Sequence, residues 1–426
     1  MGLLLIVTLI LTMLMGVPVG ICLGITTVVG MLYISPDLLI MLPQKFISGL
    51  DSFPLLAIPL FVLAGQLMAQ GGLAKRIVEL SLIFVGQVRG GLGMVVIFAT
   101  MLMSGISGSP AANTAAIGSI AVPEMKKQQY PTEFSTVLLA AAGGVSTLVP
   151  PAIDLIIIGV IANISISALF AAGILPAVLC GIGIMALAHR KAQNLELPLA
   201  EPMTEDEKRQ TLFDGLLPLL MVVIILGGIY GGVFTPTEAA AVAVVYGFCV
   251  SFFIYKELKL TELPNVLLKS CALTGVVLLV LACAAMFSFL LTFEGIPLAM
   301  ADMITTYAFN WIVFILFVHV LFFVLGMVMD CLPPILILMP ILVPVASAMG
   351  IDPVHFGIIV AANVGLGMVS PPVGICLFVS CGLSGTPIER VVKPLLPFLL
   401  VLTISLMVIT FVPQVSLFLP KLLGLS

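Results

Sequence analysis

The sequence predicts an all-α protein that crosses a membrane many times. Of its 426 residues, 61% are hydrophobic and 8% are charged, and the mean hydropathy is +1.31, whereas soluble domains carry roughly 25% charged residues. The apolar runs are long and continuous, as membrane helices of about 20 residues require, and they lack the alternation of membrane β-strands. We interpret the run that begins at Met1 as a retained helix, because no charged segment precedes it.

The most polar stretch, residues 189–214, divides the chain almost in the middle. We predict that it is a loop between two repeats, which cover residues 1–188 and 215–426. Internal repeats of this kind are typical of transporter folds, in which the halves are often inverted in the membrane. The division predicts two pseudo-symmetric inverted repeats.

A pair of consecutive prolines occurs at corresponding positions in the two halves. "YPTEFSTVLLAAAGGVSTLVPP" (130–151) aligns with "DPVHFGIIVAANVGLGMVSPP" (352–372), and residues 104–125 align with residues 325–346. Proline inside a helix removes a hydrogen bond, and a bilayer tolerates broken backbone only where it is buried in protein or lines a polar cavity. Each repeat is therefore predicted to contain a helical hairpin and a broken helix, at about 88–165 and about 310–390.

Polar residues crowd the first predicted hairpin, "MSGISGSPAANTAA" at 103–116. They are Ser104, Ser107, Ser109, Asn113 and Thr114. A hairpin that turns inside the membrane would place these hydroxyls and this amide at its tip, where they could bind a solute. The alternative is a face of small residues that lets two helices pack closely.

Two carboxylates lie in apolar surroundings. Asp154 follows the first proline pair and Asp330 lies at the second hairpin break. Carboxylates inside a membrane are costly and usually functional, so either could hydrogen-bond a polyol substrate, carry a coupling proton or cap a broken helix. Asn163 and Asn363 are weaker candidates for the same cavity. Because no Lys or Arg lies near the hairpins at membrane depth, an anionic solute would need bound cations, which favours coupling to a cation.

The broken helices also predict cation sites. Where a helix stops, carbonyl groups lose their donors, and oxygen ligands of this kind bind hard cations such as Na⁺. One predicted site is flanked by Gly105, Gly144 and Val149. The other is flanked by Gly326, Gly367 and Ser370. The alternative is a pair of kinks without a ligand.

The sequence gives little support to an enzyme. It contains neither the P-loop of ATP-driven pumps nor the HExxH motif of metalloproteases. "GISG" at 105–108 resembles the Gly-x-Ser-Gly of rhomboid-type intramembrane serine proteases, for which His319 would be the one plausible base. That alternative leaves the duplicated proline pair unexplained, so we predict a protein that is not an enzyme.

The ordered motifs "SGISGSPAANTAAIGS", "GGVSTLVPPAID" and "GLGMVSPPVGICLF" resemble the large (M) membrane subunit of tripartite ATP-independent periplasmic (TRAP) transporters. The resemblance covers essentially the whole chain. The related divalent anion/sodium symporters have similar architecture but usually a Ser-Asn-Thr signature at the hairpin tips. Here Asn113 and Thr114 follow Ala112, so that signature is only partial.

The resemblance implies an elevator-type secondary transporter in a bacterial inner membrane. A small membrane subunit (Q type) and a periplasmic substrate-binding protein (P type) would be its partners, and a Na⁺ gradient would drive uptake of an organic acid anion. Sialic acid is favoured as the substrate and a C4-dicarboxylate comes next, because Asp330 and nearby hydroxyls suit a polyhydroxylated acid. The alternative within transport is a symporter that needs no binding protein.

The resemblance also implies site residues. By similarity, the substrate would lie between the hairpin tips, near Ser109, Asp154 and Asp330, and we add the amides of Asn113 and Asn363. Two or more Na⁺ ions are expected. The residues implied for one Na⁺ are Ser104, Ser107, Gly144, Val149 and Pro151. The residues implied for a second Na⁺ are Gly326, Gly367, Ser370 and Val373.

Overall fold

The computed structural model describes residues 2–425, except for 87, 89, 196, 198–203, 297–298 and 300–309. Throughout that part of the chain the regular structure is helical, and no strand occurs. Seven of the described helices are long and apolar enough to cross a membrane. They are Phe53–Gln70, Ile166–Asn194, Glu205–Tyr230, Pro236–Ile254, Leu263–Phe293, Trp311–Val328 and Ile388–Phe411. The prediction of an all-α polytopic membrane protein is confirmed.

The first half of the chain forms ten α-helices within the described residues. They are α1 (Gly2–Leu14), α2 (Val19–Ile34), α3 (Met41–Ser48), α4 (Ala57–Gln70), α5 (Leu73–Val85), α6 (Gly91–Ser107), α7 (Pro110–Lys127), α8 (Thr132–Val145), α9 (Ile153–Ala162) and α10 (Ile166–Asn194). Short 3₁₀ segments at Pro36–Ile40 and Phe53–Leu56 precede α3 and α4.

The second half repeats much of this order. Its described helices are α11 (Glu205–Tyr230), α12 (Pro236–Cys249), α13 (Leu263–Phe293), α15 (Trp311–Val328), α16 (Leu332–Ala348), α17 (Pro353–Val369), α18 (Ile375–Ser384), α19 (Ile388–Phe411) and α20 (Gln414–Leu422). A π-helical turn, Val250–Ile254, follows α12.

Both predicted hairpins and both predicted broken helices are present. We call α6 and α7 hairpin 1, α15 and α16 hairpin 2, α8 with α9 broken helix 1, and α17 with α18 broken helix 2. Broken helix 1 is interrupted between Val145 and Ile153, and broken helix 2 between Val369 and Ile375. The Pro-Pro bond in each interruption is cis. The duplicated architecture predicted from the aligned proline pairs is therefore confirmed.

The two halves interlock through these elements. The first helix of each hairpin packs on the broken helix of its own half, α6 on α8 and α15 on α17. The second helix packs on the far half-helix of the other repeat, α7 on α18 and α16 on α9. Since α8 and α17 also pack on each other at the centre, the hairpins and broken helices form one interleaved body.

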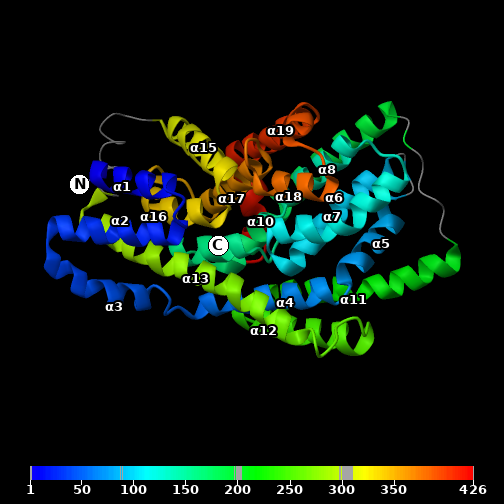
Figure 1. Cartoon of the computed structure of the whole chain (residues 1–426), viewed down its shortest axis with the longest axis horizontal. Helices are drawn as coiled ribbons and strands as arrows, with labels where there is room; N and C mark the ends of the chain where they lie inside the picture. The colour runs from blue at the N-terminus through cyan, green and yellow to red at the C-terminus, as the bar shows by residue number, and fades with distance from the viewer. Residues whose placement is uncertain are drawn as a thin grey trace.

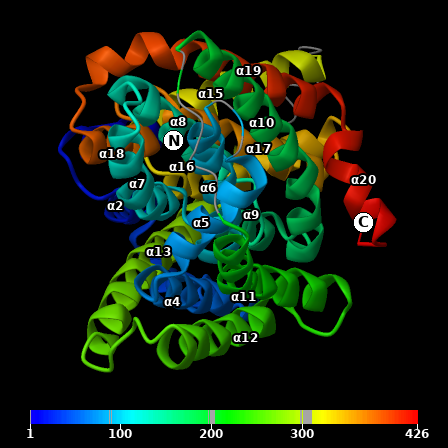
Figure 2. The same ribbon diagram turned by 90° about the vertical axis from the view of Figure 1, so that its right-hand side faces the viewer.

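A second group of helices lies along one side of this body. Figure 1 shows α4, α11, α12 and α13 along one long side, and Figure 2 shows them beneath the hairpins and broken helices. We call these four helices the scaffold layer. Within it α4 packs on α12 and α13, and α11 packs on α12. The hairpins therefore have the scaffold layer on one side, and a site between the two groups can be formed by both.

The polar stretch 189–214 is less loop-like than predicted. Helix α10 continues to Asn194, and α11 begins at Glu205. The new helix starts in a capping box, in which Thr204 and Glu207 bond each other's backbone N–H groups, an arrangement that stabilises helix N-termini. Most of the segment between the two helices lies outside the described residues, and the predicted repeat boundaries stay a prediction.

Candidate functional site

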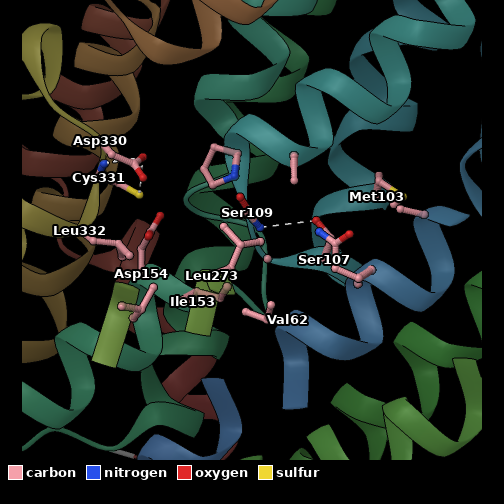
Figure 3. A pocket seen from close by; sticks show the side chains of 17 residues that line it. Val62, Met103, Ser107, Ser109, Ile153, Asp154, Leu273, Asp330, Cys331 and Leu332 are labelled. Atoms are coloured by element: carbon pink, nitrogen blue, oxygen red, sulfur yellow. Dashed lines mark hydrogen bonds between the residues drawn. The ribbon is translucent and has the colours of Figure 1, made fainter. Parts of the chain in front are cut away.

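A cavity lies where the two hairpin tips meet the scaffold layer. It has a volume of about 110 Å³ and is lined on one side by α4 and α13. Its other wall is made by the tip of hairpin 1, the start of α9 and the tip of hairpin 2. Figure 3 shows Asp330, Cys331 and Asp154 grouped at one end, with Ser109 and Ser107 toward the other. Three predicted substrate residues, Ser109, Asp154 and Asp330, therefore share one cavity.

Hairpin 1 turns sharply because of its sequence at 107–110. Helix α6 ends at Gly108, whose φ of +63° is a left-handed conformation that glycine adopts without strain. Helix α7 then begins at Pro110, which needs no backbone N–H at a helix start. The Ser107 hydroxyl donates to Asn113 Oδ1, and the backbone N of Ser109 lies 3.5 Å from Ser107 Oγ. The two serines thus present polar groups to the cavity.

The tip of hairpin 1 is attached to the interruption of broken helix 1. The N–H of Ile153 donates to Gly108 O at 3.2 Å, and a Cβ atom on Gly108 would lie 2.7 Å from Pro151 O. Only glycine allows so close an approach of the two backbones. The side chain of Asp154, next to Ile153, is consequently held at the cavity wall.

Asp154 is the buried acid of the cavity. Its side chain is 1% exposed, and it lies in the first turn of α9. One carboxylate oxygen, Oδ2, has no hydrogen-bond partner among the described residues. Buried polar atoms are nearly always paired in folded proteins, so an unpaired carboxylate oxygen beside a cavity is suited to accept a hydrogen bond from a solute.

Cys331 connects the two acids. Asp330 Oδ1 accepts hydrogen bonds from Cys331 N at 2.8 Å and from Cys331 Sγ at 3.3 Å, and Figure 3 shows the thiol beside Asp154 as well. A cysteine among apolar residues is usually a small packing side chain, and Cys331 is buried, but its thiol lies beside both carboxylates (Figure 3). The one signal in the sequence is its position directly after Asp330. The described residues that line the cavity include no Lys, Arg or His.

The residues predicted for the first Na⁺ come together only in part. Ser104 Oγ donates to Ser146 O at 2.7 Å, which places its hydroxyl at the start of the interruption in broken helix 1. The hydroxyl of Ser146 is buried and has no partner among the described residues. Gly144 packs against α17, because a Cβ atom on it would lie 2.7 Å from Gly365 O, and its own carbonyl oxygen accepts a hydrogen bond from Thr147 Oγ1 at 3.2 Å. Val149 and Pro151 lie within the interruption.

The residues predicted for the second Na⁺ gather around the start of the other interruption. A Cβ atom on Gly326 would lie 3.0 Å from Gly367 Cα, so α15 and α17 touch through their backbones. The N–H of Gly374 donates to Met327 O at 2.9 Å, and Ser370 Oγ donates to Leu366 O at 2.8 Å. Val373 lies in the same interruption with its side chain 42% exposed.

The two predicted amides lie in different places. Asn113 is fully buried and bonds the cavity residue Ser107, while its Nδ2 has no partner among the described residues. Asn363 does not line the cavity. It hydrogen-bonds His319, whose other ring nitrogen lies 3.1 Å from Thr410 Oγ1. The protease alternative fails here, because His319 is paired with an amide and a threonine and not with Ser107.

The interlocked hairpins and broken helices, with an acidic cavity against a scaffold layer, define a membrane transport protein. The family described as tripartite ATP-independent periplasmic transporter, DctM component, matches residues 6–415. The chain belongs to this family, and the resemblance seen in its motifs is confirmed. Several of the relatives that resemble it are named as large permeases of TRAP transporters.

Three curated relatives carry different substrate names. The chain is 39% identical to the C4-dicarboxylate TRAP transporter large permease of Pseudomonas aeruginosa, over 95% of both chains. It is 38% identical to the 2,3-diketo-L-gulonate large permease of Escherichia coli, over 87% of both. It is 37% identical to the sialic acid large permease of Vibrio cholerae, over 96% of this chain and 95% of the relative. These relatives establish the family of this chain, but their names give three different substrates and so do not identify the substrate of this chain.

A solved structure shares the fold. The crystal structure of the Alcanivorax borkumensis YdaH transporter superposes with a TM-score of 0.66 over 88% of each chain, at 16% identity. At that identity the likeness concerns the architecture alone.

Proposed function

We propose that this chain is the large membrane subunit of a TRAP transporter that imports an organic acid anion with Na⁺, by an elevator mechanism. The observation that carries the proposal is the cavity between the hairpin tips and the scaffold layer, in which Asp154 offers a free oxygen. Such a position, between two groups of helices that can move relative to each other, is where transporters bind their solute.

The elevator mechanism is supported by how the cavity is divided. One wall belongs to the interleaved hairpins and broken helices, and the other to α4 and α13 of the scaffold layer. The two bodies touch closely at Gly65 of α4, where a Cβ atom would lie 2.8 Å from Ser107 Cα. Small residues let two packed helices approach closely, and this favours a sliding movement between them. We therefore assign the interleaved elements to the moving body.

The donor sets at the two interruptions fit a hard cation. Around the first interruption they consist of serine hydroxyls and backbone carbonyls, with the buried hydroxyl of Ser146 still unpaired. Around the second, Ser370 and the closely approached Gly326 and Gly367 are available. The sets proposed are Ser104, Ser107, Gly144, Val149 and Pro151, and Gly326, Gly367, Ser370 and Val373. Bound Na⁺ would supply the positive charge that an anion requires here.

The cavity favours a sugar acid over a compact dianion. Two carboxylates would repel a second negative charge, whereas they can each accept hydrogen bonds from hydroxyl groups. Asp154 Oδ2 is free to do so, and Ser109 lies opposite. Sialic acid is therefore the first substrate to test, with 2,3-diketo-L-gulonate as a second sugar acid and a C4-dicarboxylate as the alternative.

The proposed assembly contains two further chains. We expect a small membrane subunit of the Q type and a periplasmic binding protein of the P type, in a bacterial inner membrane. The isethionate permease of Oleidesulfovibrio alaskensis, named DctMQ, supports this: the chain is 34% identical to it and covers 64% of its length. A longer relative with that name fits a large and a small subunit joined in one polypeptide.

Reconstituted uptake tests the proposal. Proteoliposomes that contain this chain and its small subunit are given each labelled acid, with or without binding protein and with or without an inward Na⁺ gradient. We expect accumulation only when both are present. Uptake without the binding protein would instead support a symporter that needs no binding protein. Uptake at the same rate with and without the Na⁺ gradient would contradict coupling to Na⁺.

A further inference from the structure

Helices α10 and α19 pack against each other in opposite directions. A Cβ atom on Gly183 would lie 2.9 Å from Val401 Cγ1, and Lys191 Nζ donates a hydrogen bond to Pro394 O at 3.4 Å. Residue numbers therefore rise along α10 while they fall along α19, and the end of α10 meets the start of α19. Figures 1 and 2 show α19 on the side of the molecule opposite the scaffold layer.

Both helices present an apolar stripe to the outside. The residues of each stripe are exposed and recur every four positions, so they lie on one face of the helix. They are Val178, Ile182 and Ala186 on α10, and Leu396, Leu400 and Ile404 on α19. Leu400 is 61% exposed and Ile182 is 57% exposed. In a membrane, outward apolar faces of this kind contact the acyl chains of lipids.

Each stripe ends in a cation, at the end where the two helices meet. Arg190 continues the stripe of α10 and Lys393 continues that of α19, and both side chains are exposed. Lys191 and Arg390 lie beside them, and the acid of these two helix ends is Glu389. Four cations and one acid leave a net charge of +3, with histidine neutral.

Among the described residues, the four cations have no acid partner. The described ion pairs belong to Lys75, Arg76, Lys127 and Lys208. Lys191 bonds a backbone carbonyl group, which does not neutralise its charge. A group of unpaired cations beside a lipid-facing surface is complementary to the headgroup of an anionic lipid.

The length of the two stripes fits one leaflet of a bilayer. Twelve residues separate Val178 from Arg190, which corresponds to about 18 Å at 1.5 Å per residue. Eleven residues, or about 17 Å, separate Lys393 from Ile404. The hydrocarbon core of a bilayer is about 30 Å thick, so one leaflet contributes about 15 Å. A lipid whose phosphate lies at the cations therefore has its acyl chains along both stripes.

We propose that the outer faces of α10 and α19 bind an acidic glycerophospholipid from the surrounding bilayer. Its phosphate lies at Arg190, Arg390 and Lys393, where each guanidinium can form paired hydrogen bonds with phosphate oxygens. Its acyl chains lie along the two stripes. We call this surface the α10–α19 face. The proposal requires that the chain lies in a bilayer, and it does not depend on which solute the chain transports.

A lipid fits the α10–α19 face better than a helix of another protein. An apolar helix would cover the stripes but would leave the cations at their end without a negative partner. An acidic phospholipid combines a negative headgroup and acyl chains in one molecule, in the same order along the membrane normal as the cations and the stripes. Charge and hydrophobicity thus point to the same occupant.

Quenching by brominated lipids tests the proposal at a chosen position. The full-length chain carries Trp311→Phe, which removes its single tryptophan, and Leu400→Trp in the stripe of α19. It is reconstituted in phosphatidylcholine with increasing amounts of phosphatidylglycerol whose acyl chains carry bromine. One cation at a membrane surface raises the affinity for an anionic lipid about 5-fold. We therefore expect phosphatidylglycerol to bind at least about 5-fold more tightly than phosphatidylcholine.

Matched variants separate this face from the rest of the lipid-facing surface. Val320→Trp places the tryptophan on α15, where Val320 is 64% exposed and the helix contains no Lys or Arg, so the two lipids should bind equally there. Arg190→Gln combined with Lys393→Gln should lower the preference at Leu400→Trp at least about 5-fold. Lys75→Gln, which also removes an exposed cation, should leave that preference unchanged. Melting temperatures confirm that each variant is folded.

Equal affinities of the two lipids at Leu400→Trp would overturn the proposal. So would an unchanged preference after Arg190 and Lys393 are both replaced, or the same preference at Val320→Trp. Two further measurements test the occupant. Inorganic phosphate at matched ionic strength should not reduce the quenching, and displacement by it would show a site for free phosphate. Reconstitution with the small membrane subunit should also preserve the quenching, and its loss would show that this subunit covers the face.

Discussion

Gly144 and Gly365 meet where α8 crosses α17, at the centre of the interleaved body. A Cβ atom on Gly144 would lie 2.7 Å from Gly365 O, and one on Gly365 would lie 2.3 Å from Gly144 O. Each glycine therefore faces the backbone carbonyl of the other, and the pair is nearly symmetric. The two repeats touch through the helix turns that precede their interruptions.

Replacing either glycine by alanine should destabilise the protein. The added methyl group would press on a backbone carbonyl in a fully buried crossing, and overpacking of this kind costs about 1–3 kcal/mol. Thermal unfolding of Gly144→Ala and Gly365→Ala measures the effect. The matched control is Gly382→Ala on α18, where a Cβ atom meets nothing within 4 Å. Equal melting temperatures for all three variants would contradict the close crossing.

Arg76 should matter far more than its neighbour Lys75. Arg76 Nη1 lies 2.8 Å from Glu257 Oε1 and 2.9 Å from Gly72 O, and its guanidinium is stacked 3.6 Å from the centroid of the Tyr255 ring. Lys75 is 66% exposed and its ammonium is 3.8 Å from Glu79, so its ion pair is worth little. We expect Arg76→Ala to lower stability by about 1–2 kcal/mol and Lys75→Ala to change it little. Denaturation of both variants distinguishes them, and a similar loss in both would be evidence against the network.

Much of the architecture could be predicted because hydrophobicity and helix breakers are local signals. Continuous apolar runs predict membrane helices, and the aligned proline pairs at 150–151 and 371–372 predict where the two helices break. The length of α10 could not be predicted, because its polar end at Asn194 looks like a loop in composition. Contacts between elements that are distant in the sequence, such as α7 with α18, depend on packing in three dimensions. Neither segment carries a local sequence signal that names its partner.

Asp154→Asn should impair transport while leaving the protein folded. The change removes the charge but keeps the shape of a side chain whose Oδ2 has no partner in the described part of the chain. A hydrogen bond to a charged group contributes about 1.5–3 kcal/mol, so uptake should fall about 10- to 100-fold. Uptake in proteoliposomes is compared with Asp37→Asn, a change in the 3₁₀ segment Pro36–Ile40. If Asp154→Asn takes up substrate as fast as the wild type, the assignment of Asp154 to the substrate site is wrong.

The candidate site could be predicted only where a polar residue interrupts an apolar run. Ser109, Asp154 and Asp330 have that signal, and the structure brings them to one cavity. Asn363 has the same signal, yet it bonds His319, because its helix turns that face toward α15 and not toward the hairpin tips. Cys331 has no such signal, because a cysteine among apolar residues is usually read as a packing residue. Its position beside two carboxylates follows from how hairpin 2 meets α9.

The thiol of Cys331 should be needed as a hydrogen-bond donor and not for its size. Its Sγ lies 3.3 Å from Asp330 Oδ1 and beside Asp154 (Figure 3), so its single hydrogen lies next to two neighbouring carboxylates. Cys331→Ser keeps a donor, and Cys331→Val keeps a similar volume without one. We expect the serine variant to transport nearly as well as the wild type. The valine variant should lose most of its uptake, because the two carboxylates then repel each other with no thiol hydrogen between them. Uptake measured side by side, with melting temperatures to confirm folding, distinguishes the two roles: full activity in Cys331→Val, with loss in Cys331→Ser, would show that packing is what the site requires.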